Sequence, residues 1–241
     1  MPESDPILPS YHLLTCGGSL IEAPAERVVY EASVFLSANR LPQRNPQLSR
    51  YERIPDVARS LENALKFLVP MVSNMATRYL VTETANPSWT LLLHNHAKVR
   101  GDTALCGWLT QVLSTRAVGW CCQKHTLKKE RGGELSGYPG GTSFDIHVNG
   151  EQVRSIACVY EGKTWRFAQF GTPYEFEEVA RYAAPRKKDR LTCEMVRNYL
   201  AALGVFPWEQ QFYRVDSEHS ARGIRFVSDD PAMNAWLEPV L

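Results

Sequence analysis

The sequence predicts an α+β fold with one mainly antiparallel sheet and helices packed on it, and a mixed α/β arrangement also fits. Two amphipathic stretches with helical spacing, residues 103–113 and 193–203, lie on either side of a run of short strand-like segments. Asn149-Gly150 joins two of those segments, and this dipeptide is the strongest short signal for an antiparallel hairpin. Such a string of elements is simplest to build as one sheet covered by helices.

Length and charge bound the domain organisation and the partners. The chain has 241 residues, which favours a single α+β domain over residues 1–241. A helical N-terminal subdomain over residues 1–86, with a sheet-containing core over residues 87–241, is the alternative. Basic and acidic residues balance at 27 and 26, and a net charge of +1 argues against direct binding to nucleic acid or to a membrane surface.

The compartment follows from apolar runs and cysteines. No run approaches the ~18 apolar residues that a membrane-spanning helix needs. The first six residues are acidic and rich in proline, so we expect no signal peptide. Six cysteines are scattered without a repeated spacing, which is typical of reduced thiols. We therefore expect a soluble cytoplasmic protein.

The first third of the chain is predicted to be mainly helical. Residues 11–14 resemble a short strand that Cys16-Gly17-Gly18-Ser19 would end, and residues 25–38 have helical spacing. Residues 39–53 contain two prolines and many polar side chains, so we expect a loop. Pro55 suits the first turn of a helix. The apolar stripe behind it is formed by Val57, Ala58, Leu61, Leu65, Leu68 and Val69.

The best-patterned part of the chain is a strand, helix and strand between residues 88 and 123. Residues 79–84 and 89–96 are predicted to form a hairpin across Asn86-Pro87. Asp102 or Thr103 would cap the helix at residues 103–113, and a second strand follows at residues 117–123.

Beyond residue 123 a polar excursion precedes strands and then helix. Residues 124–141 are charged and contain five glycines. Three strands are predicted at residues 143–148, 153–160 and 164–170. A short helix is expected at residues 176–183. Thr192 should cap the last helix and Gly204 should follow its end. Residues 223–227 could form a final strand.

Several side chains could support chemistry without completing a known motif. His94 and His96 alternate onto one strand face, so a metal held by His94, His96 and Cys122 is one alternative. A small intracellular enzyme with a metal or thiol site near His94, Asp102, Cys121 and His125 is a second. No Gly-x-Ser-x-Gly motif occurs, and Gly137-Tyr138-Pro139-Gly140-Gly141 lacks the lysine of a phosphate-binding loop. We therefore predict no catalytic residues and no cofactor.

The excursion at residues 124–141 is the best candidate for binding a partner. A compact domain does not need a loop of this length, and long loops are commonly functional. Mixed charge beside a tyrosine suits protein recognition. Acidic side chains near the loop could mimic phosphate groups. The predicted partner-binding residues are Lys128, Glu130, Arg131, Glu134, Tyr138 and Asp145.

Residues 88–213 resemble a group of uncharacterised bacterial cytoplasmic proteins. The resemblance is carried by Trp89-Thr90, Asn95, Arg100-Gly101-Asp102, Cys121, Val153-Arg154-Ser155, Gly162, Trp165, Phe170-Gly171, Phe176, Arg186-Lys187-Lys188-Asp189-Arg190-Leu191-Thr192, Tyr199, Ala202-Leu203-Gly204 and Phe212-Tyr213. Some members of the group look like immunity partners of antibacterial toxins delivered by type VI secretion. The resemblance implies an immunity protein that binds a cognate toxin, plausibly a nuclease, and covers its active site. It leaves the oligomeric state open.

Overall fold

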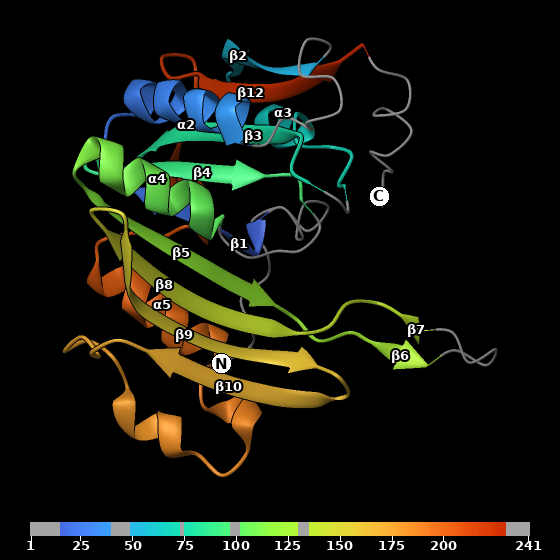
Figure 1. The fold of residues 1–241 in the computed structure, drawn as a ribbon, viewed down its shortest axis with the longest axis vertical. Coiled ribbons are helices and arrows are strands. Elements are labelled where there is room, and N and C mark those ends of the chain that lie inside the picture. The colour runs from blue at the N-terminus through green and yellow to red at the C-terminus, as the bar shows by residue number, and fades with distance from the viewer. Residues whose placement is uncertain (1–14, 40–48, 73–74, 97–101, 130–134, 230–241) are drawn as a thin grey trace.

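A ten-stranded antiparallel sheet is the centre of the fold (Figure 1). The computed structural model describes residues 15–39, 49–72, 75–96, 102–129 and 135–229. The strand order is β10-β9-β8-β5-β1-β4-β3-β12-β2, and β11 pairs with β3. Its strands are β1 (Gly17–Ile21), β2 (Ser49–Ala58), β3 (Arg78–Thr84), β4 (Thr90–His94), β5 (Arg116–Gln123), β8 (Gly141–Val148), β9 (Glu151–Glu161), β10 (Thr164–Phe170), β11 (Tyr213–Arg214) and β12 (Ala221–Ser228). The predicted α+β class is confirmed.

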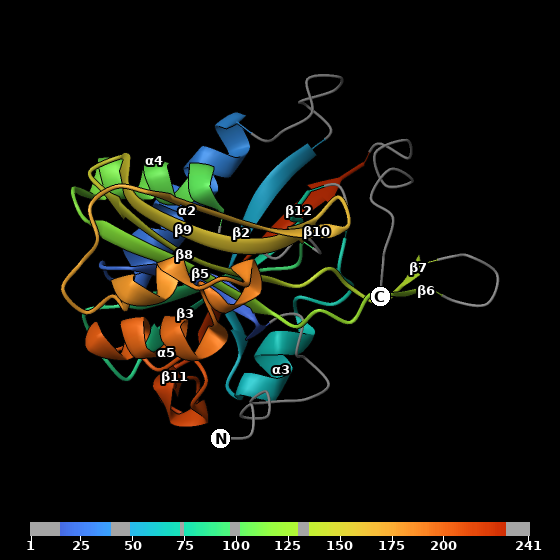
Figure 2. The ribbon, with the colours of Figure 1, turned by 90° about the horizontal axis from the view of Figure 1, so that it is seen from below.

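Four α-helices in the described part of the chain cover both faces of the sheet. They are α2 (Ala25–Asn39), α3 (Leu61–Lys66), α4 (Thr103–Leu113) and α5 (Cys193–Ala202). Figure 2 shows α2 and α4 on one face, with α3 and α5 on the other. None of the helices described here is long and apolar enough to cross a membrane.

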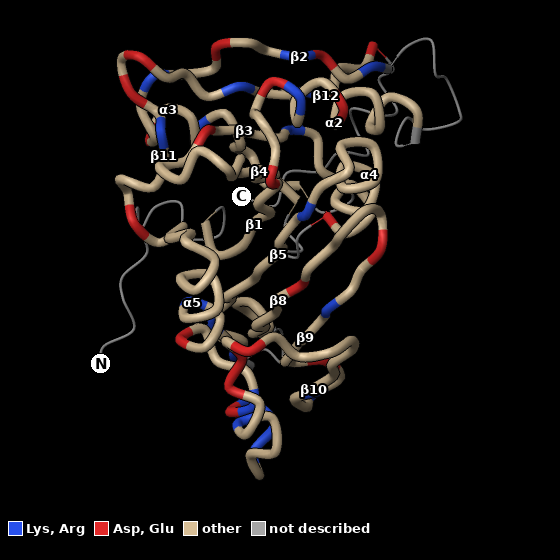
Figure 3. The backbone as a smooth tube through the Cα atoms, turned by 90° about the vertical axis from the view of Figure 1, so that its left-hand side faces the viewer, with Lys and Arg blue, Asp and Glu red and all other residues tan. Residues whose placement is uncertain are grey.

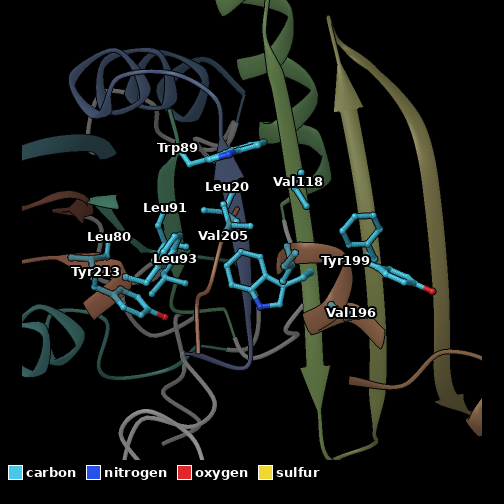
Figure 4. Packing of buried hydrophobic residues seen from close by; sticks show 14 of the residues in the cluster. Leu20, Leu80, Trp89, Leu91, Leu93, Val118, Val196, Tyr199, Val205 and Tyr213 are labelled. Carbon is cyan, nitrogen blue, oxygen red and sulfur yellow. The ribbon is translucent and has the colours of Figure 1, made fainter. Parts of the chain in front are cut away.

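The two faces hold separate hydrophobic clusters. Leu91 and Leu93 belong to the cluster on the α5 face, and Leu92 belongs to the cluster on the α2–α4 face. Figure 4 shows Val196 and Tyr199 of α5 in the first cluster. Because β4 is buried on both faces, its side chains form a continuous apolar run rather than an alternating one.

The central strand β1 was not predicted, because Gly17-Gly18 was interpreted as the end of a strand. All five residues of β1 are buried. A Cβ at Gly18 would lie 2.7 Å from Leu93 Cδ2 and 2.9 Å from the Trp120 ring. Glycine is therefore required by close packing in the middle of the sheet and not by a turn.

The prediction of a loop followed by a helix at Pro55 is also wrong. Residues 49–58 form the edge strand β2, which pairs with β12, and α3 begins only at Leu61. An edge strand tolerates proline because one side of its backbone has no partner. Ser60 accepts a hydrogen bond from Asn63 N (3.4 Å) and caps α3.

Local signals elsewhere were interpreted correctly. Asp102 caps α4, Thr192 caps α5, and Gly204 has a φ of +71°. Asn149 and Gly150 form the turn between β8 and β9. Tyr79 pairs with His94 in the β3–β4 hairpin. The short helix expected at residues 176–183 is a 3₁₀ helix, η2 (Val179–Ala183). The short strand expected at residues 11–14 lies outside the described residues.

The strands described before residue 87 belong to the same sheet as the rest. They are β1, β2 and β3, and β3 pairs with β4 across residue 86. In the described residues, the region before residue 87 is therefore not a separate helical subdomain.

Candidate functional site

One row of side chains on the α2–α4 face contains two of the residues singled out for chemistry, His94 and Cys121. Cys121 lies opposite Gly17 in the β1–β5 pair, and Ser143 lies opposite Cys121. Continuing the β1–β4 register from Ser19–Leu92 by two residues places His94 opposite Gly17. Tyr79 is the next residue in this row, beside His94. Neighbours in a row share a face of the sheet. We call Tyr79, His94, Gly17, Cys121 and Ser143 the Gly17 row.

Asp102 joins this row from the N-terminus of α4. Its Oδ1 accepts a hydrogen bond from Leu105 N (3.1 Å) as the helix cap, and its Oδ2 accepts one from the Tyr79 hydroxyl (3.3 Å). The Tyr79 and His94 rings pack edge to face with centroids 6.0 Å apart. His94 Nδ1 accepts a hydrogen bond from His96 N (3.2 Å). The structure thus brings Asp102 and His94 together through Tyr79.

The geometry of the Gly17 row does not assemble a nucleophile and a base. His94 and Cys121 are separated by the whole of β1, so their Cα atoms lie about 10 Å apart. The Cys121 thiol is 3.6 Å from the carbonyl oxygen of Gly141, to which it donates. A thiol nucleophile and its base need direct hydrogen-bond contact. Both carboxylate oxygens of Asp102 already accept hydrogen bonds, so this side chain has a structural role.

Two residues of the alternative sites lie on the opposite face. Cys122 faces α5, with its Sγ 4.0 Å from the Cys193 carbonyl oxygen. His125 packs on Tyr160, with ring centroids 4.2 Å apart, and on Trp165. The structure therefore does not bring Cys122 to the face that carries His94, and it places His125 away from His94, Asp102 and Cys121. Among the described residues, no group of three or more His, Cys, Asp or Glu side chains is placed to hold a metal.

The buried thiol next to the row is also unsuited to catalysis. Cys106 of α4 donates to Ser19 Oγ (3.2 Å). Burial raises the pKa of Cys106 to about 12, so it is a neutral thiol at physiological pH.

A second candidate site is the hairpin that precedes β8. Its strands β6 (Lys128–Lys129) and β7 (Leu135–Ser136) form a two-stranded sheet of their own. Figures 1 and 2 show β6 and β7 standing clear of the main sheet. We call residues 128–136 the arm.

Hydrogen bonds join the two chain segments at the base of the arm to one another. Thr126 N donates to Tyr138 O (3.0 Å), Tyr138 N donates to Thr126 Oγ1 (3.0 Å), and Gly140 N donates to His125 Nδ1 (3.1 Å). Gly137 has a φ of +85°, and a Cβ there would lie 2.4 Å from Thr126 O. The backbone conformation at the base therefore requires glycine.

The predicted partner-binding residues separate into three groups. Lys128 is exposed on β6, whereas Tyr138 is half-buried at the base of the arm. Glu130, Arg131 and Glu134 lie outside the described residues. Asp145 lies in β8, within the strand predicted at residues 143–148, and accepts a hydrogen bond from Gln152 Nε2 (3.1 Å). It is on the main sheet and not on the arm.

A buried ion pair between Arg154 of β9 and Glu177 was not predicted from the sequence. Arg154 and Glu177 side chains are fully buried, with Nη2 and Oε2 2.6 Å apart. Arg154 uses all five N–H groups, two on Glu177, one on Gln169 Oε1 and two on the carbonyls of Phe170 and Gly171. Because no donor is left for a ligand, the pair fixes the fold.

The acceptors of this pair are satisfied as well. Glu177 also accepts from Tyr174 N (3.0 Å) and from the Tyr182 hydroxyl (2.8 Å). Tyr199 OH lies 3.0 Å from Tyr182 OH and itself accepts from Glu178 N. The network ties β9 and β10 to η2 and α5. Such a network is costly to leave partly satisfied.

Acid should weaken this network. Burial raises the pKa of Glu177, but hydrogen bonds from Arg154, Tyr174 N and Tyr182 outweigh it and hold that pKa below its ordinary value of 4.5. A lowered folded-state pKa contributes stability above the unfolded-state pKa that is lost as pH falls through the folded value. We expect the difference in unfolding free energy between wild type and Glu177→Gln to shrink as the pH is lowered below the ordinary pKa of a glutamate side chain. Urea titrations at neutral and acidic pH measure it, and a difference independent of pH would contradict it.

The described residues thus offer a row in which Tyr79, His94 and Cys121 are hydrogen-bonded within the fold, and an arm that leaves the main sheet. The row takes one residue from each of five strands, β3, β4, β1, β5 and β8, whereas the arm is one short segment. Comparison with known proteins found no matching family model, no matching curated protein and no matching solved structure.

Proposed function

We propose that this chain is a non-catalytic immunity protein that binds a cognate antibacterial toxin through the arm and covers the toxin's active site. The observation that carries this proposal is the separation of β6 and β7 from the ten-stranded sheet. A two-stranded hairpin with no partner in its own domain gains little stability by itself. Its projection from a fixed base suits insertion into the cleft of another protein.

The internal chemistry of the body supports a surface-acting protein. Arg154 and Glu177 are hydrogen-bonded to one another and to the surrounding backbone. Asp102 accepts hydrogen bonds from Leu105 N, as the helix cap, and from the Tyr79 hydroxyl. Charged groups used in this way hold the fold and are not available to substrate.

Two carboxylates of the arm suit a cleft that binds nucleic acid. The sequence of the arm places Glu130 and Glu134 among Lys128, Lys129 and Arg131. Carboxylates can occupy phosphate positions in a basic cleft, and complementary charge speeds association. A stable interface buries about 800 Å² on each partner. The arm would supply the centre of such an interface and the surface around its base the rim.

Shortening the arm is expected to abolish toxin binding and leave the fold intact. Residues 128–136 are replaced by a Gly-Ser-Gly link, which keeps Gly137, Tyr138 and the bonds at the base. The toxin to test is the protein encoded by the adjacent gene, co-expressed in inactivated form. Copurification measures binding, and urea unfolding measures the fold.

A charge reversal on the arm gives a milder test with a matched control. Glu134→Lys should weaken copurification, whereas Glu194→Lys, which reverses an exposed acidic residue on α5, should not. Full binding by the shortened variant would remove the arm from the interface. Failure of the wild-type chain to bind or inhibit the neighbouring protein would remove the immunity function itself.

A further inference from the structure

The outer edge of β10 is a second surface that could bind a partner, because its backbone groups pair with no strand in the described residues. This strand ends the sheet order and pairs with β9 over seven consecutive residues without a register shift. Its other side pairs with no strand in the described ranges. An edge strand presents a row of backbone N–H and C=O groups that can pair with another chain.

The two edges of the sheet are protected differently. β2 carries Pro55, and its charged residues are Arg50, Glu52, Arg53 and Asp56. Proline, charge and a bulge are the usual means of blocking an edge, and the β2–β12 pair also has a register shift. β10 has no proline and one charged residue, Arg166, and its Phe170 is 60% exposed. The β10 edge is therefore open to strand addition.

A basic stretch of chain borders this edge. Residues 179–190, which we call the basic segment, contain η2 and η3 (Lys187–Asp189). Tyr182 packs on Phe167 of β10 with ring centroids 5.6 Å apart, and the Arg190 guanidinium lies 5.7 Å from the Phe167 ring. In Figures 1 and 3 this part of the chain extends beyond β10. A strand added to β10 would thus lie beside the basic segment.

The basic segment is strongly charged for so neutral a chain. It contains five Arg or Lys residues and one Asp, a net of +4 (5 − 1), against +1 for the whole chain. Asp189 is used by Arg186, 2.5 Å away. Arg181, Lys187 and Lys188 are exposed and form no ion pair with the described residues. The surface beside the edge therefore attracts acidic groups.

We infer that β10 binds an extended acidic peptide as an additional antiparallel or parallel strand, with its acidic side chains over the basic segment. Side chains of a strand alternate between faces, so acids at every second position would all face that segment. A positive surface alone would also suit phosphate groups. The open row of backbone groups favours a peptide, because main-chain hydrogen bonds give affinity in strand addition. This site is separate from the arm.

Fluorescence anisotropy with a labelled, end-capped peptide, Glu-Val-Glu-Thr-Glu-Val-Glu-Thr-Glu, tests the inference on the full chain. Two further peptides carry N-methyl groups on alternate residues in the two possible frames. One frame blocks the hydrogen bonds to β10 and should weaken binding by at least about tenfold, whereas the other should bind within about threefold of the parent. The double variant Lys187→Glu, Lys188→Glu should bind the unmethylated peptide at least about tenfold more weakly. Lys128→Glu, on the arm, should leave it unchanged.

Each other outcome would overturn the inference. Absence of peptide binding, or equal binding by both N-methyl frames, would mean that no strand is added. Equal or tighter binding of a nine-nucleotide single-stranded DNA, lost in the same double variant, would assign the surface to nucleic acid. Dimerisation of the protein alone, seen in sedimentation and inhibited by the active N-methyl frame, would assign the edge to a second copy.

Discussion

Arg154→Met is expected to destabilise the protein by about 3–5 kcal/mol, because it leaves the buried Glu177 carboxylate without its cation. The same change removes the donors to the carbonyls of Phe170 and Gly171. These carbonyls lie at the end of β10, so the end of that strand should loosen with the network. Urea unfolding followed by tryptophan fluorescence and circular dichroism measures the loss.

Arg166→Met is the matched control, because it makes the same arginine-to-methionine change at an exposed position on the neighbouring strand β10. Arg166 forms a surface ion pair with Glu161 at 3.6 Å, and both side chains are about two-thirds exposed. Exposed pairs of this kind contribute about 0–1 kcal/mol. A similar loss of stability in both variants would contradict the structural role assigned to Arg154.

The double variant Arg154→Met, Glu177→Gln separates the pair from its surroundings. Each single change leaves one buried charge unpaired, whereas the double change removes both charges. Tyr174 N and the Tyr182 hydroxyl bind different carboxylate oxygens of Glu177, so the single amide oxygen introduced by Glu177→Gln can accept from only one of them. We expect the double variant to be more stable than the sum of the single effects predicts, by about 1 kcal/mol or more. Additive losses would mean that the two charges do not depend on one another.

Local signals predicted the elements that local chemistry determines. The Asp102 and Thr192 caps and the Asn149-Gly150 turn act over three or four residues, and the structure has each of them. Gly17-Gly18 and Pro55 were misinterpreted because their roles depend on neighbours far along the chain. Gly18 is fixed by Leu93 and Trp120, and Pro55 by the position of β2 at an edge.

The candidate site was only partly predictable for the same reason. The Gly17 row exists because β1 lies between β4 and β5, and sequence patterning gives no register for that insertion. Register decides which of two adjacent cysteines shares a face with His94, and a shift of one residue exchanges them. Cys121 takes that place and Cys122 faces α5. Arg154 had a readable signal, since it alternates in phase with the buried Ile156 and Cys158.

Asn95→Ala is expected to destabilise the protein by about 3 kcal/mol or more, because it leaves several buried backbone groups without a hydrogen-bond partner. Asn95 Oδ1 accepts from Thr77 N (2.8 Å) and Arg78 N (2.9 Å), and Nδ2 donates to Pro70 O and Thr77 Oγ1 (both 2.9 Å). The fully buried amide therefore fastens Pro70, Thr77 and Arg78 to the end of β4.

Asn95→Ala should also disturb the residues next to Asn95, in addition to lowering the overall stability. His94 precedes Asn95 and packs on Tyr79, so the Gly17 row should lose order when Thr77 and Arg78 detach from Asn95. Ser88→Ala is the control, an exposed position before β4 where a change should stay within about 0.5 kcal/mol. Urea unfolding compares the two variants, and amide exchange at Thr77 and Arg78 reports the detachment directly. Equal stability and unchanged exchange in Asn95→Ala would mean that the backbone bonds from Val72 N to Asn95 O and from Asn95 N to Arg78 O hold this segment unaided.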